Sequence, residues 1–312
     1  MSDSVIEYEA LPAAESAGYE YEVVLVTYHS RGQLEGLLEG THCDQRLVVV
    51  DNASGADGVP ELVDTLTGGR FVDGEDSGFA AAANRGARTS TAEYLVFANP
   101  DSRPTPEIWE ALVDELRFDP KLGAVAAATT NQAGHIEIGV GGWEPTPGRA
   151  IVNALGLHRV FPNAGVYASP APGAHVELGW MGGACMAVRR QQFVDLGGFD
   201  ERYFVYNEDM AFGRTLREAG LRQDLRTDLL VPHATGTSDG GGTKMPQQRG
   251  ASMAAYLHDH NGAPAALAMR AIFVIGMLPR IAISAARGRR NVARQHLDYI
   301  KGIVTKRSPY RP

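Results

Sequence analysis

Short apolar runs alternate with stretches of helical periodicity along the first 130 residues. Four continuous apolar runs are typical of strands buried on both faces, and they occupy residues 23–27, 47–50, 95–98 and 124–128. A shorter strand is expected at residues 70–72. Helices are expected just after Ser30 and at residues 59–66, 79–87 and 106–118. Because strand and helix alternate with short connections, we predict an α/β fold: a mostly parallel sheet with helices on both faces.

The regular pattern breaks up between residues 131 and 174 into Gly, Pro and Asn with isolated apolar residues. Loops of that length inside a compact domain are usually functional. Regularity returns from residue 176 to residue 233, and includes a helix at 210–219 and a strand at 229–231. Residues 236–250 are again Gly-rich and polar, and we expect them to be mobile.

Composition narrows the class of protein. With 312 residues, 44% hydrophobic and 21% charged, the chain is globular and long enough for one large domain, alone or with an appendage. Cys43 and Cys185 lack the spacing of metal ligands and are expected to be free thiols of a reducing compartment. Residues 1–20 contain five acids and no Lys or Arg, which excludes a secretory signal and predicts a flexible leader.

Charge is divided unevenly along the chain. From Arg270 onward there are ten basic residues and one acid, a net charge of +9, whereas the preceding residues carry −17. A basic tail on an acidic body indicates an anionic partner surface. Nucleic acid is not expected, because no aromatic residues are interleaved with the basic ones.

The tail contains an apolar helical stretch at residues 265–286. Arg270, Pro279 and Arg280 interrupt it, so its uninterrupted run, 271–278, is far too short to span a membrane. We expect basic amphipathic helices that lie on anionic lipid at the membrane interface. The alternative is that these helices pack against the body of the protein or against a second copy in a homodimer.

Two common nucleotide-binding motifs are absent. A dinucleotide-binding enzyme needs G-x-G-x-x-G after its first strand, where this chain has one glycine, Gly32, and the chain contains no G-x-x-x-x-G-K-[ST]. Candidate chemistry follows the strand at 95–98 instead, which Pro100 ends abruptly. Asp101 stands where open α/β sheets bind ligands, and its carboxylate suits Mg2+ or Mn2+ with phosphate oxygens. The alternative is a simple turn, since Asn, Pro and Asp are turn formers.

Seven motifs occur in the order in which family 2 glycosyltransferases carry them. The first four are Val23-Val-Leu-Val-Thr-Tyr28, Val48-Val-Val-Asp-Asn-Ala-Ser54, Asp76-Ser-Gly-Phe-Ala-Ala-Ala-Ala-Asn-Arg-Gly86 and Phe97-Ala-Asn-Pro-Asp101. The last three are Gly182-Gly-Ala-Cys-Met-Ala-Val188, Gly197-Gly-Phe-Asp200 and Tyr203-Phe-Val-Tyr-Asn-Glu-Asp209. Over residues 23–236 the chain therefore resembles this family, in particular its rhamnosyltransferase-like members, which share the Asn-Pro-Asp variant.

The resemblance implies a GT-A fold, a metal ion, a nucleotide-sugar donor and inversion at the anomeric centre. It also implies a division of the chain. Residues 1–20 form the leader, residues 21–245 the catalytic domain and residues 246–312 the C-terminal amphipathic basic helices. Within the catalytic domain, residues 21–130 are expected to bind the donor and residues 131–245 the acceptor.

For the donor, the resemblance places Asp51 and Asn52 beside the pyrimidine base, where a carboxylate can accept the ring N–H. The full set of implied donor-binding residues is Thr27, Tyr28, Asp51, Asn52, Gly78, Asn84, Arg85, Asn99 and Asp101. The structural alternatives are a turn-capping role for Asp51 and a core-edge position for Tyr28, and Arg88 is as good a diphosphate contact as Arg85.

For the chemistry, the resemblance implies Asp101 and His233 as ligands of Mg2+ or Mn2+, although a lone histidine is usually structural. Asp209 matches the general base that removes the proton of the acceptor hydroxyl, and Glu208 would orient it. Two acids at a helix N-terminus are also favourable on dipole grounds alone. Many relatives carry a further aspartate where this chain has Ala211.

For the acceptor, the resemblance implies contacts from Trp180, Met181, Gly182 and Gly183. A sugar ring would stack on Trp180, and the glycines would admit it close to the backbone. Packing of Trp180 in the core is the alternative.

The sequence therefore predicts an inverting, metal-dependent glycosyltransferase that acts on a lipid-linked or cell-wall glycan. We expect it in the cytoplasm, at the inner face of the plasma membrane. The first candidate for the donor is dTDP-L-rhamnose, and the second is UDP-galactofuranose, UDP-glucose or another UDP-sugar. Two other classes compete: a non-catalytic nucleotide-sugar-binding homologue, which the presence of Asp101, Asp209 and His233 disfavours, and a nucleotidyltransferase, whose Gly-rich basic loop is poorly matched at residues 28–32.

Overall fold

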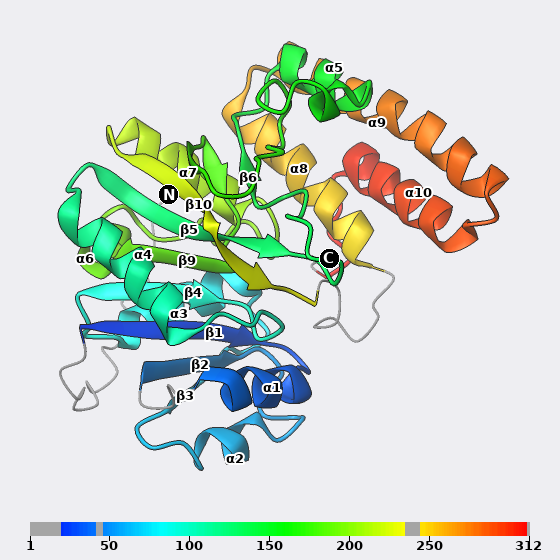
Figure 1. Ribbon diagram of the computed structural model, residues 1–312. Helices are drawn as coiled ribbons and strands as arrows, with labels where there is room; N and C mark the ends of the chain where they lie inside the picture. The colour runs from blue at the N-terminus through cyan, green and yellow to red at the C-terminus, as the bar shows by residue number, and fades with distance from the viewer. Residues whose placement is uncertain (1–19, 42–45, 235–243, 311–312) are drawn as a thin grey trace, which may run out of the picture.

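An eight-stranded sheet forms the centre of the computed structural model, which describes residues 20–41, 46–234 and 244–310 (Figure 1). Its strand order is β3-β2-β1-β4-β9-β5-β10-β7. In sequence order these strands are β1 (Tyr21–Thr27), β2 (Leu47–Asp51), β3 (Arg70–Asp73), β4 (Tyr94–Ala98), β5 (Leu122–Thr130), β7 (His175–Glu177), β9 (Cys185–Arg189) and β10 (Arg222–Pro232). Neighbours pair in parallel except β9, which runs against β4 and β5, and β7, which runs against β10. The predicted mostly parallel sheet is confirmed.

Helices cover both faces of the sheet because strand side chains alternate between two cores. Val23 and Leu25 of β1 belong to one hydrophobic cluster, and Val24 between them belongs to the other. The first face carries α1 (Arg31–Thr41), α2 (Val59–Val63) and α4 (Pro106–Phe118). The second face carries α3 (Phe79–Thr89), α6 (Arg190–Asp195) and α7 (Glu208–Glu218).

The stretch predicted to be irregular, residues 131–174, contains more regular structure than its sequence indicates. It forms β6 (Gly141–Gly142), which pairs with β8 (Trp180–Met181), the helix α5 (Pro147–Ala154) and a short 3-10 turn, η2 (Leu157–Arg159). Thr146 caps α5 by accepting a hydrogen bond from the backbone N–H of Arg149 at 3.3 Å. The helix was missed because it packs on the distant α9 rather than on the sheet, so its apolar side is decided by a tertiary contact.

Three helices follow the sheet: α8 (Met245–His260), α9 (Ala263–Ala286) and α10 (Arg290–Thr305). α8 belongs to a third hydrophobic cluster together with Trp180 and Met210 of the preceding region. The expected division of the chain at residue 246 therefore does not coincide with a break in the core. α10 packs closely on α8, where a Cβ at Gly302 would lie only 2.0 Å from the carbonyl oxygen of Gln247.

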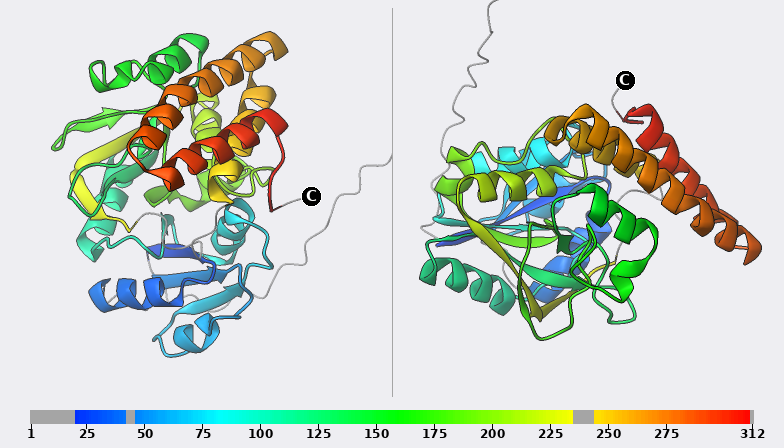
Figure 2. Two further views of the ribbon diagram at one scale, coloured as in Figure 1. Left: turned by 90° about the vertical axis from the view of Figure 1, so that its right-hand side faces the viewer. Right: turned by 90° about the horizontal axis from the view of Figure 1, so that it is seen from above.

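The helices α9 and α10 form a hairpin that extends beyond the rest of the molecule (Figure 2). The helix expected at residues 265–286 is present as α9, which continues through Pro279 for 24 residues. By length and composition alone it is apolar and long enough to cross a membrane, and 22% of its apolar window is buried. Among the described residues it is the one helix that meets this test.

Three predictions fall on residues that the structure does not describe or describes in part. Cys43, the leader up to residue 19 and residues 236–243 of the Gly-rich stretch lie outside the described ranges. The remainder of that stretch was also expected to be mobile, but this is wrong for residues 245–250, which form the start of α8 with Gln248 and Gly250 buried. Cys185 is a buried free thiol, as expected, and burial raises its pKa to about 12.

Candidate active site

Two adjoining cavities open at the carboxyl edge of the sheet. The first, of about 270 Å³, lies at the ends of β1, β2 and β4; the second, of about 400 Å³, lies between β5, β8 and the start of α7. They share part of their lining, which consists of Phe79, Asn99, Val205, Tyr206, His233 and Arg249. The site is therefore one continuous recess with two compartments, which we call the first cavity and the second cavity.

Asp101 and His233 meet at the boundary of these cavities although they are 132 residues apart in sequence. The Nε2 atom of His233 lies 3.1 Å from Oδ1 of Asp101, and its Nδ1 atom lies 2.8 Å from Oε2 of Glu137. Glu137 also accepts a hydrogen bond from the hydroxyl of Thr129 at 2.8 Å. Burial alone lowers the pKa of His233, but hydrogen bonds and charge from the two carboxylates outweigh it and raise the pKa to about 9.

This cluster fits a divalent cation as a two-ligand site. Within the described ranges, no group of three or more His, Cys, Asp or Glu side chains is arranged to hold a metal. A carboxylate oxygen and an imidazole nitrogen 3.1 Å apart still provide two ligands of the kind that Mg2+ or Mn2+ accepts, with the remaining positions left to diphosphate and water. Glu137 is a residue that sequence reasoning missed, because it lies in the stretch without periodicity.

The acidic pair Glu208-Asp209 begins α7 and lines the second cavity. The two residues before it, Tyr206 and Asn207, adopt left-handed backbone angles with φ of 68° and 72°. Such strain is sustained by surrounding structure and is concentrated at functional sites. The backbone N–H of Met210 donates to Oδ1 of Asp209 at 2.7 Å and fixes its carboxylate.

The two acids differ in protonation. Asp209 is half-buried, and desolvation raises its pKa to about 6. The backbone N–H of Met210 and the charge of Arg249 lower the pKa, but by less than desolvation raises it. Glu208 is buried, with 7% of its surface exposed, and burial and the neighbouring Asp209 raise its pKa well above the usual range. Its Oε2 atom has no hydrogen-bond partner in the described part of the chain. Burial and the charge of Asp209 therefore both favour the neutral form of Glu208, whereas the pKa of Asp209 is raised only to about 6.

Three of the four predicted acceptor residues line the second cavity: Trp180, Gly182 and Gly183. A Cβ at Gly182 would lie 4.0 Å from Oδ2 of Asp209, so the glycine leaves room directly beside that carboxylate. Trp180 is 4% exposed, belongs to a hydrophobic cluster and packs edge-on against Tyr167 with a ring-centroid distance of 5.7 Å, which is the core packing that the sequence left open as the alternative. Met181 is 1% exposed, belongs to the core and lines neither cavity.

Most of the predicted donor residues line the first cavity: Thr27, Tyr28, Asn52, Gly78, Asn99 and Asp101. Gly78 is required there, because its φ is +88° and a Cβ would lie 2.3 Å from the carbonyl oxygen of Phe204. The backbone N–H of Phe79 donates to that same oxygen at 2.7 Å. The start of α3 is thus fixed against the segment that leads to the acidic pair.

Three predicted donor residues are not brought to either cavity: Asp51, Asn84 and Arg85. The carboxylate of Asp51 is 0% exposed and accepts hydrogen bonds from Thr27 Oγ1 and the backbone N–H of Gly55, both at 2.8 Å. Asn84 binds both backbone groups of Phe199, at 2.8 and 2.9 Å. Arg85 pairs with Glu75 at 2.8 Å. Each of the three side chains therefore has a structural partner. For Asp51 this is the turn-capping alternative that the sequence left open.

Arg249 is a second residue that sequence reasoning missed. It lies on α8, lines both cavities, and its guanidinium is centred 4.6 Å from the ring centre of Tyr206. It was missed because residues after 245 were expected to form a separate basic appendage, so their contact with the site had no local signal.

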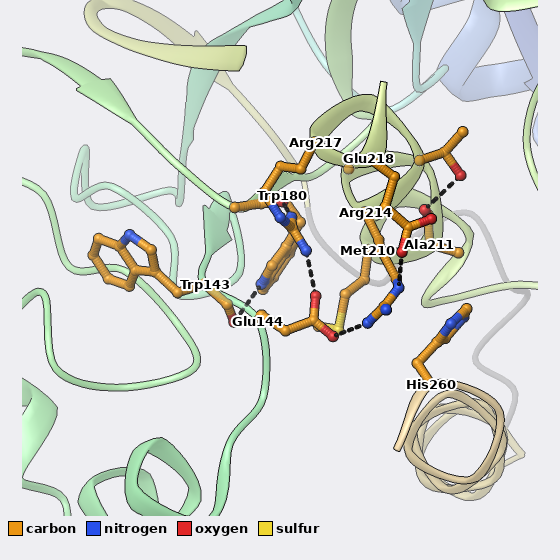
Figure 3. Close-up of polar contacts among 12 residues, drawn as sticks. Trp143, Glu144, Trp180, Met210, Ala211, Arg214, Arg217, Glu218 and His260 are labelled. Carbon is orange, nitrogen blue, oxygen red and sulfur yellow. Dashed lines mark hydrogen bonds and ion pairs between the residues drawn. The ribbon is translucent and has the colours of Figure 1, made fainter. Parts of the chain in front are cut away.

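An ion-pair network holds the acceptor side together (Figure 3). Arg214 and Arg217 of α7 both point to the carboxylate of Glu144, which also accepts a hydrogen bond from the hydroxyl of Tyr256 at 2.8 Å. Beside it, the indole N–H of Trp180 donates to the carbonyl oxygen of Trp143 at 3.3 Å. The network ties α7, α8 and the strand of Trp180 into one unit, so the acidic pair and the wall of the second cavity keep a fixed spacing.

Comparison with known proteins supports the family resemblance that the sequence motifs indicate. The family model described as Glycosyl transferase family 2 matches residues 22–161. The chain is 29% identical over 226 residues to N-acetylglucosaminyl-diphospho-decaprenol L-rhamnosyltransferase of Mycobacterium tuberculosis, a match that covers 64% of this chain and 70% of that protein. It is 28% identical over 153 residues to the O-antigen biosynthesis protein RfbC of Myxococcus xanthus, covering 46% of this chain and 11% of that protein.

Among solved structures, a mannosyltransferase of Pyrobaculum calidifontis in complex with GDP-Man and Mn2+ has the same fold. It superposes with a TM-score of 0.59 at 18% sequence identity and covers 92% of this chain and 87% of that one. The match includes both the sheet and most of the residues that follow it. On this evidence residues 22–161 form a glycosyltransferase domain that matches family 2, the chain has the GT-A fold, and it is similar to a rhamnosyltransferase.

Proposed function

We propose that this enzyme moves a sugar from a nucleotide-diphosphate sugar to a hydroxyl of a lipid-linked glycan, with inversion, and that Asp209 is the general base. The observation that carries the proposal is the half-buried Asp209 in the second cavity, beside a protonated Glu208 and next to the first cavity with Asp101 and His233. One cavity suits an anionic donor, and the other has a base and room for an acceptor.

In the first cavity, Asp101 and His233 would hold Mg2+ or Mn2+. A divalent cation there neutralises charge that develops on a diphosphate leaving group. Glu137 accepts from Nδ1 of His233 and so leaves Nε2 directed at Asp101. Arg249 adds a positive charge that comes from the protein itself. Further donor contacts are proposed for Thr27, Tyr28, Asn52, Gly78 and Asn99, while Asp51, Asn84 and Arg85 would support the walls from behind.

In the second cavity, Asp209 accepts the proton of the acceptor hydroxyl while its oxygen attacks the anomeric carbon. The bond from that carbon to the phosphate oxygen breaks on the opposite side, and the nucleoside diphosphate takes the electron pair. Gly182 and Gly183 leave the space in which the acceptor approaches, and Trp180 supplies an apolar wall. The proton held on Glu208 keeps a second negative charge away from Asp209, so that the base stays effective.

For the donor, dTDP-L-rhamnose is our first candidate. The Mycobacterium tuberculosis relative is named for L-rhamnosyl transfer to N-acetylglucosaminyl-diphospho-decaprenol, and residues 99–101 carry the Asn-Pro-Asp variant. The same relative supports a lipid-linked glycan as acceptor. A UDP-sugar, such as UDP-galactofuranose or UDP-glucose, is the second candidate.

The donor proposal is tested first by thermal unfolding with dTDP, UDP, GDP and their sugars, each with Mn2+, Mg2+ or chelator. We expect a metal-dependent rise in the melting temperature with dTDP or UDP, since a ligand of the folded state stabilises it. Transfer of radiolabelled rhamnose from dTDP-L-rhamnose to an extracted polyprenyl-linked acceptor then tests the reaction. No stabilisation by any nucleotide would refute the donor site and favour a non-catalytic homologue.

We also propose that the hairpin of α9 and α10 docks on anionic lipid at the inner face of the plasma membrane. Apolar side chains are exposed on α9 and on the neighbouring segment after α5, namely Leu155, Val160, Phe161, Leu267, Ile275, Leu278 and Ile283. Arg287, Arg289 and Arg290 are exposed at the turn of the hairpin. An apolar surface rimmed by arginines fits the interface of an anionic bilayer and would bring a lipid-linked acceptor to the enzyme.

Sedimentation with vesicles distinguishes this surface from a dimer contact. We expect co-sedimentation with phosphatidylglycerol vesicles, little with phosphatidylcholine, and loss of binding when Arg287, Arg289 and Arg290 are replaced by Glu. Light scattering on the same proteins would detect a homodimer. If the protein is a dimer and does not bind vesicles, the hairpin is a subunit contact instead.

A further inference from the structure

The end of the chain returns to the first cavity. After α10, Lys306 turns the backbone with a φ of 55°, and the hydroxyl of Ser308 donates to Oε1 of Gln248 at 2.6 Å. The side chain of Gln247 donates to the carbonyl oxygen of Arg307 at 3.3 Å. These contacts attach residues 306–310, which we call the C-terminal segment, to the start of α8. In the left view of Figure 2 the segment runs down from α10 toward α3.

Tyr310 at the end of this segment forms part of the cavity wall. Its ring stacks on Phe204 with a centroid distance of 5.5 Å and an interplanar angle of 13°. Both rings line the first cavity. Lys244 places its ammonium 5.7 Å from the centre of the Tyr310 ring. An aromatic pair with a cation beside it is therefore built at the mouth of the compartment proposed for the donor.

The position of Phe204 connects Tyr310 to the rest of the site. The carbonyl oxygen of Phe204 accepts from the N–H of Phe79, and its ring lies against Gly78, where a Cβ would come within 2.6 Å of it. Gly78, Phe204 and Tyr310 thus form one continuous wall that draws on three distant parts of the chain. A ligand that fills the first cavity would contact this wall, whereas a smaller ligand would leave water between itself and the wall.

We infer that Tyr310 is a binding residue for the nucleoside diphosphate of the donor, with the C-terminal segment as one wall of the donor site. The inference rests on the proposed function, because it takes the first cavity as the donor compartment. An aromatic ring fixed by stacking and by hydrogen bonds of its own segment offers a flat apolar surface to a base or ribose at little entropic cost.

The test is isothermal titration of dTDP, UDP and GDP, with Mn2+, into the full chain and three variants. We expect Tyr310→Ala to weaken the best-bound nucleotide roughly three- to tenfold, and Tyr310→Phe to bind within twofold of the unchanged protein. Arg307→Ala is the matched control, since its side chain is exposed and its contact to Gln247 uses the backbone. Equal affinity of Tyr310→Ala and the unchanged protein overturns the inference. Failure of every nucleotide to bind the unchanged protein overturns the proposed donor site as well.

A second measurement does not depend on a substitution. Trypsin cuts after Lys306 and Arg307, both exposed, and releases the C-terminal segment. If a nucleotide contacts Tyr310, saturating dTDP or UDP with Mn2+ slows this release several-fold, as followed by mass spectrometry. A release rate that stays the same while titration shows the nucleotide bound would rule out the segment as part of the donor site.

Discussion

The two cavities place acidic side chains in different surroundings. In the first cavity Asp101 faces a histidine that a second carboxylate, Glu137, holds in place, so the acid is arranged to bind a cation. In the second cavity Asp209 lies beside another acid, and burial raises its pKa to about 6 although the charge of Arg249 acts in the opposite direction. In the roles that we propose, one carboxylate is a ligand and the other a base because their neighbours act differently on their charge.

A third acid, Asp51, shows what happens without a cavity. It is the last residue of the parallel strand β2, but its carboxylate is buried and accepts hydrogen bonds from Thr27 and Gly55. The three acids are hard to rank from sequence, because each follows an apolar run or begins a helix. Four experiments distinguish the roles of these acids.

The substitution Asp209→Asn should distinguish most clearly between the roles proposed for the two cavities. It removes the base and keeps the shape, so we expect turnover to fall by about 10²–10⁴, with the affinity for dTDP or UDP unchanged within twofold. Initial rates of sugar transfer and isothermal titration measure the two effects. Asp64→Asn, a change at an exposed acid that lines neither cavity, is the control and should leave both values as they are. Near-normal turnover of Asp209→Asn would remove Asp209 from the mechanism.

The substitution Asp101→Asn should have the opposite signature. We expect the affinity for the nucleoside diphosphate to fall about 10- to 100-fold in Mn2+. In chelator the substituted and unchanged proteins should bind alike, because the lost interaction runs through the cation. Titrations in Mn2+ and in EDTA give the comparison, and the unchanged protein in EDTA is the internal control. Equal weakening in both buffers contradicts a ligand role for Asp101.

The pH dependence of transfer sharpens the contrast between the acids. Because the pKa of Asp209 is raised to about 6, the base is protonated below that pH, and kcat/KM should fall about tenfold for each further pH unit. An unperturbed aspartate would place this limb about two units lower. The profile of kcat/KM between about pH 5 and pH 8 is measured on material shown to be folded throughout. A limb near pH 4 would mean that the carboxylate in the working enzyme is better solvated than in this structure.

The substitution Asp51→Ala tests the acid without a cavity and should give the smallest change in function. It leaves Thr27 Oγ1 and the Gly55 N–H without their acceptor, so the free energy of unfolding should fall by about 1–3 kcal/mol. Donor affinity should fall less than in Asp101→Asn. Urea unfolding and titration measure both, with Asp64→Ala, an exposed acid at the end of α2, as the control. A large loss of donor affinity with unchanged stability would instead support the predicted contact between Asp51 and the base.

Much of the donor half was predictable because its signals are local. The strands at 23–27, 47–50 and 95–98 are continuous apolar runs, and the structure confirms each within two residues. Asp101 could be identified from the sequence because it follows the carboxyl end of a parallel strand, and open α/β sheets bind ligands at that edge. The acceptor half was less predictable, since α5 and the wall around Trp180 are stabilised by helices far away in sequence.

The sequence by itself determined the α/β class, the parallel core and the positions of the acids that end strands or begin helices. These follow from periodicity and from chain direction, which neighbouring residues specify together. Three contacts depend on tertiary packing: Glu137 lies beside His233, Arg249 of α8 lines both cavities, and Tyr310 lines the first cavity. Each of these contacts joins segments about 50 to 230 residues apart, and no local pattern encodes which surfaces will meet, because that choice is made by the packing of whole helices against the sheet.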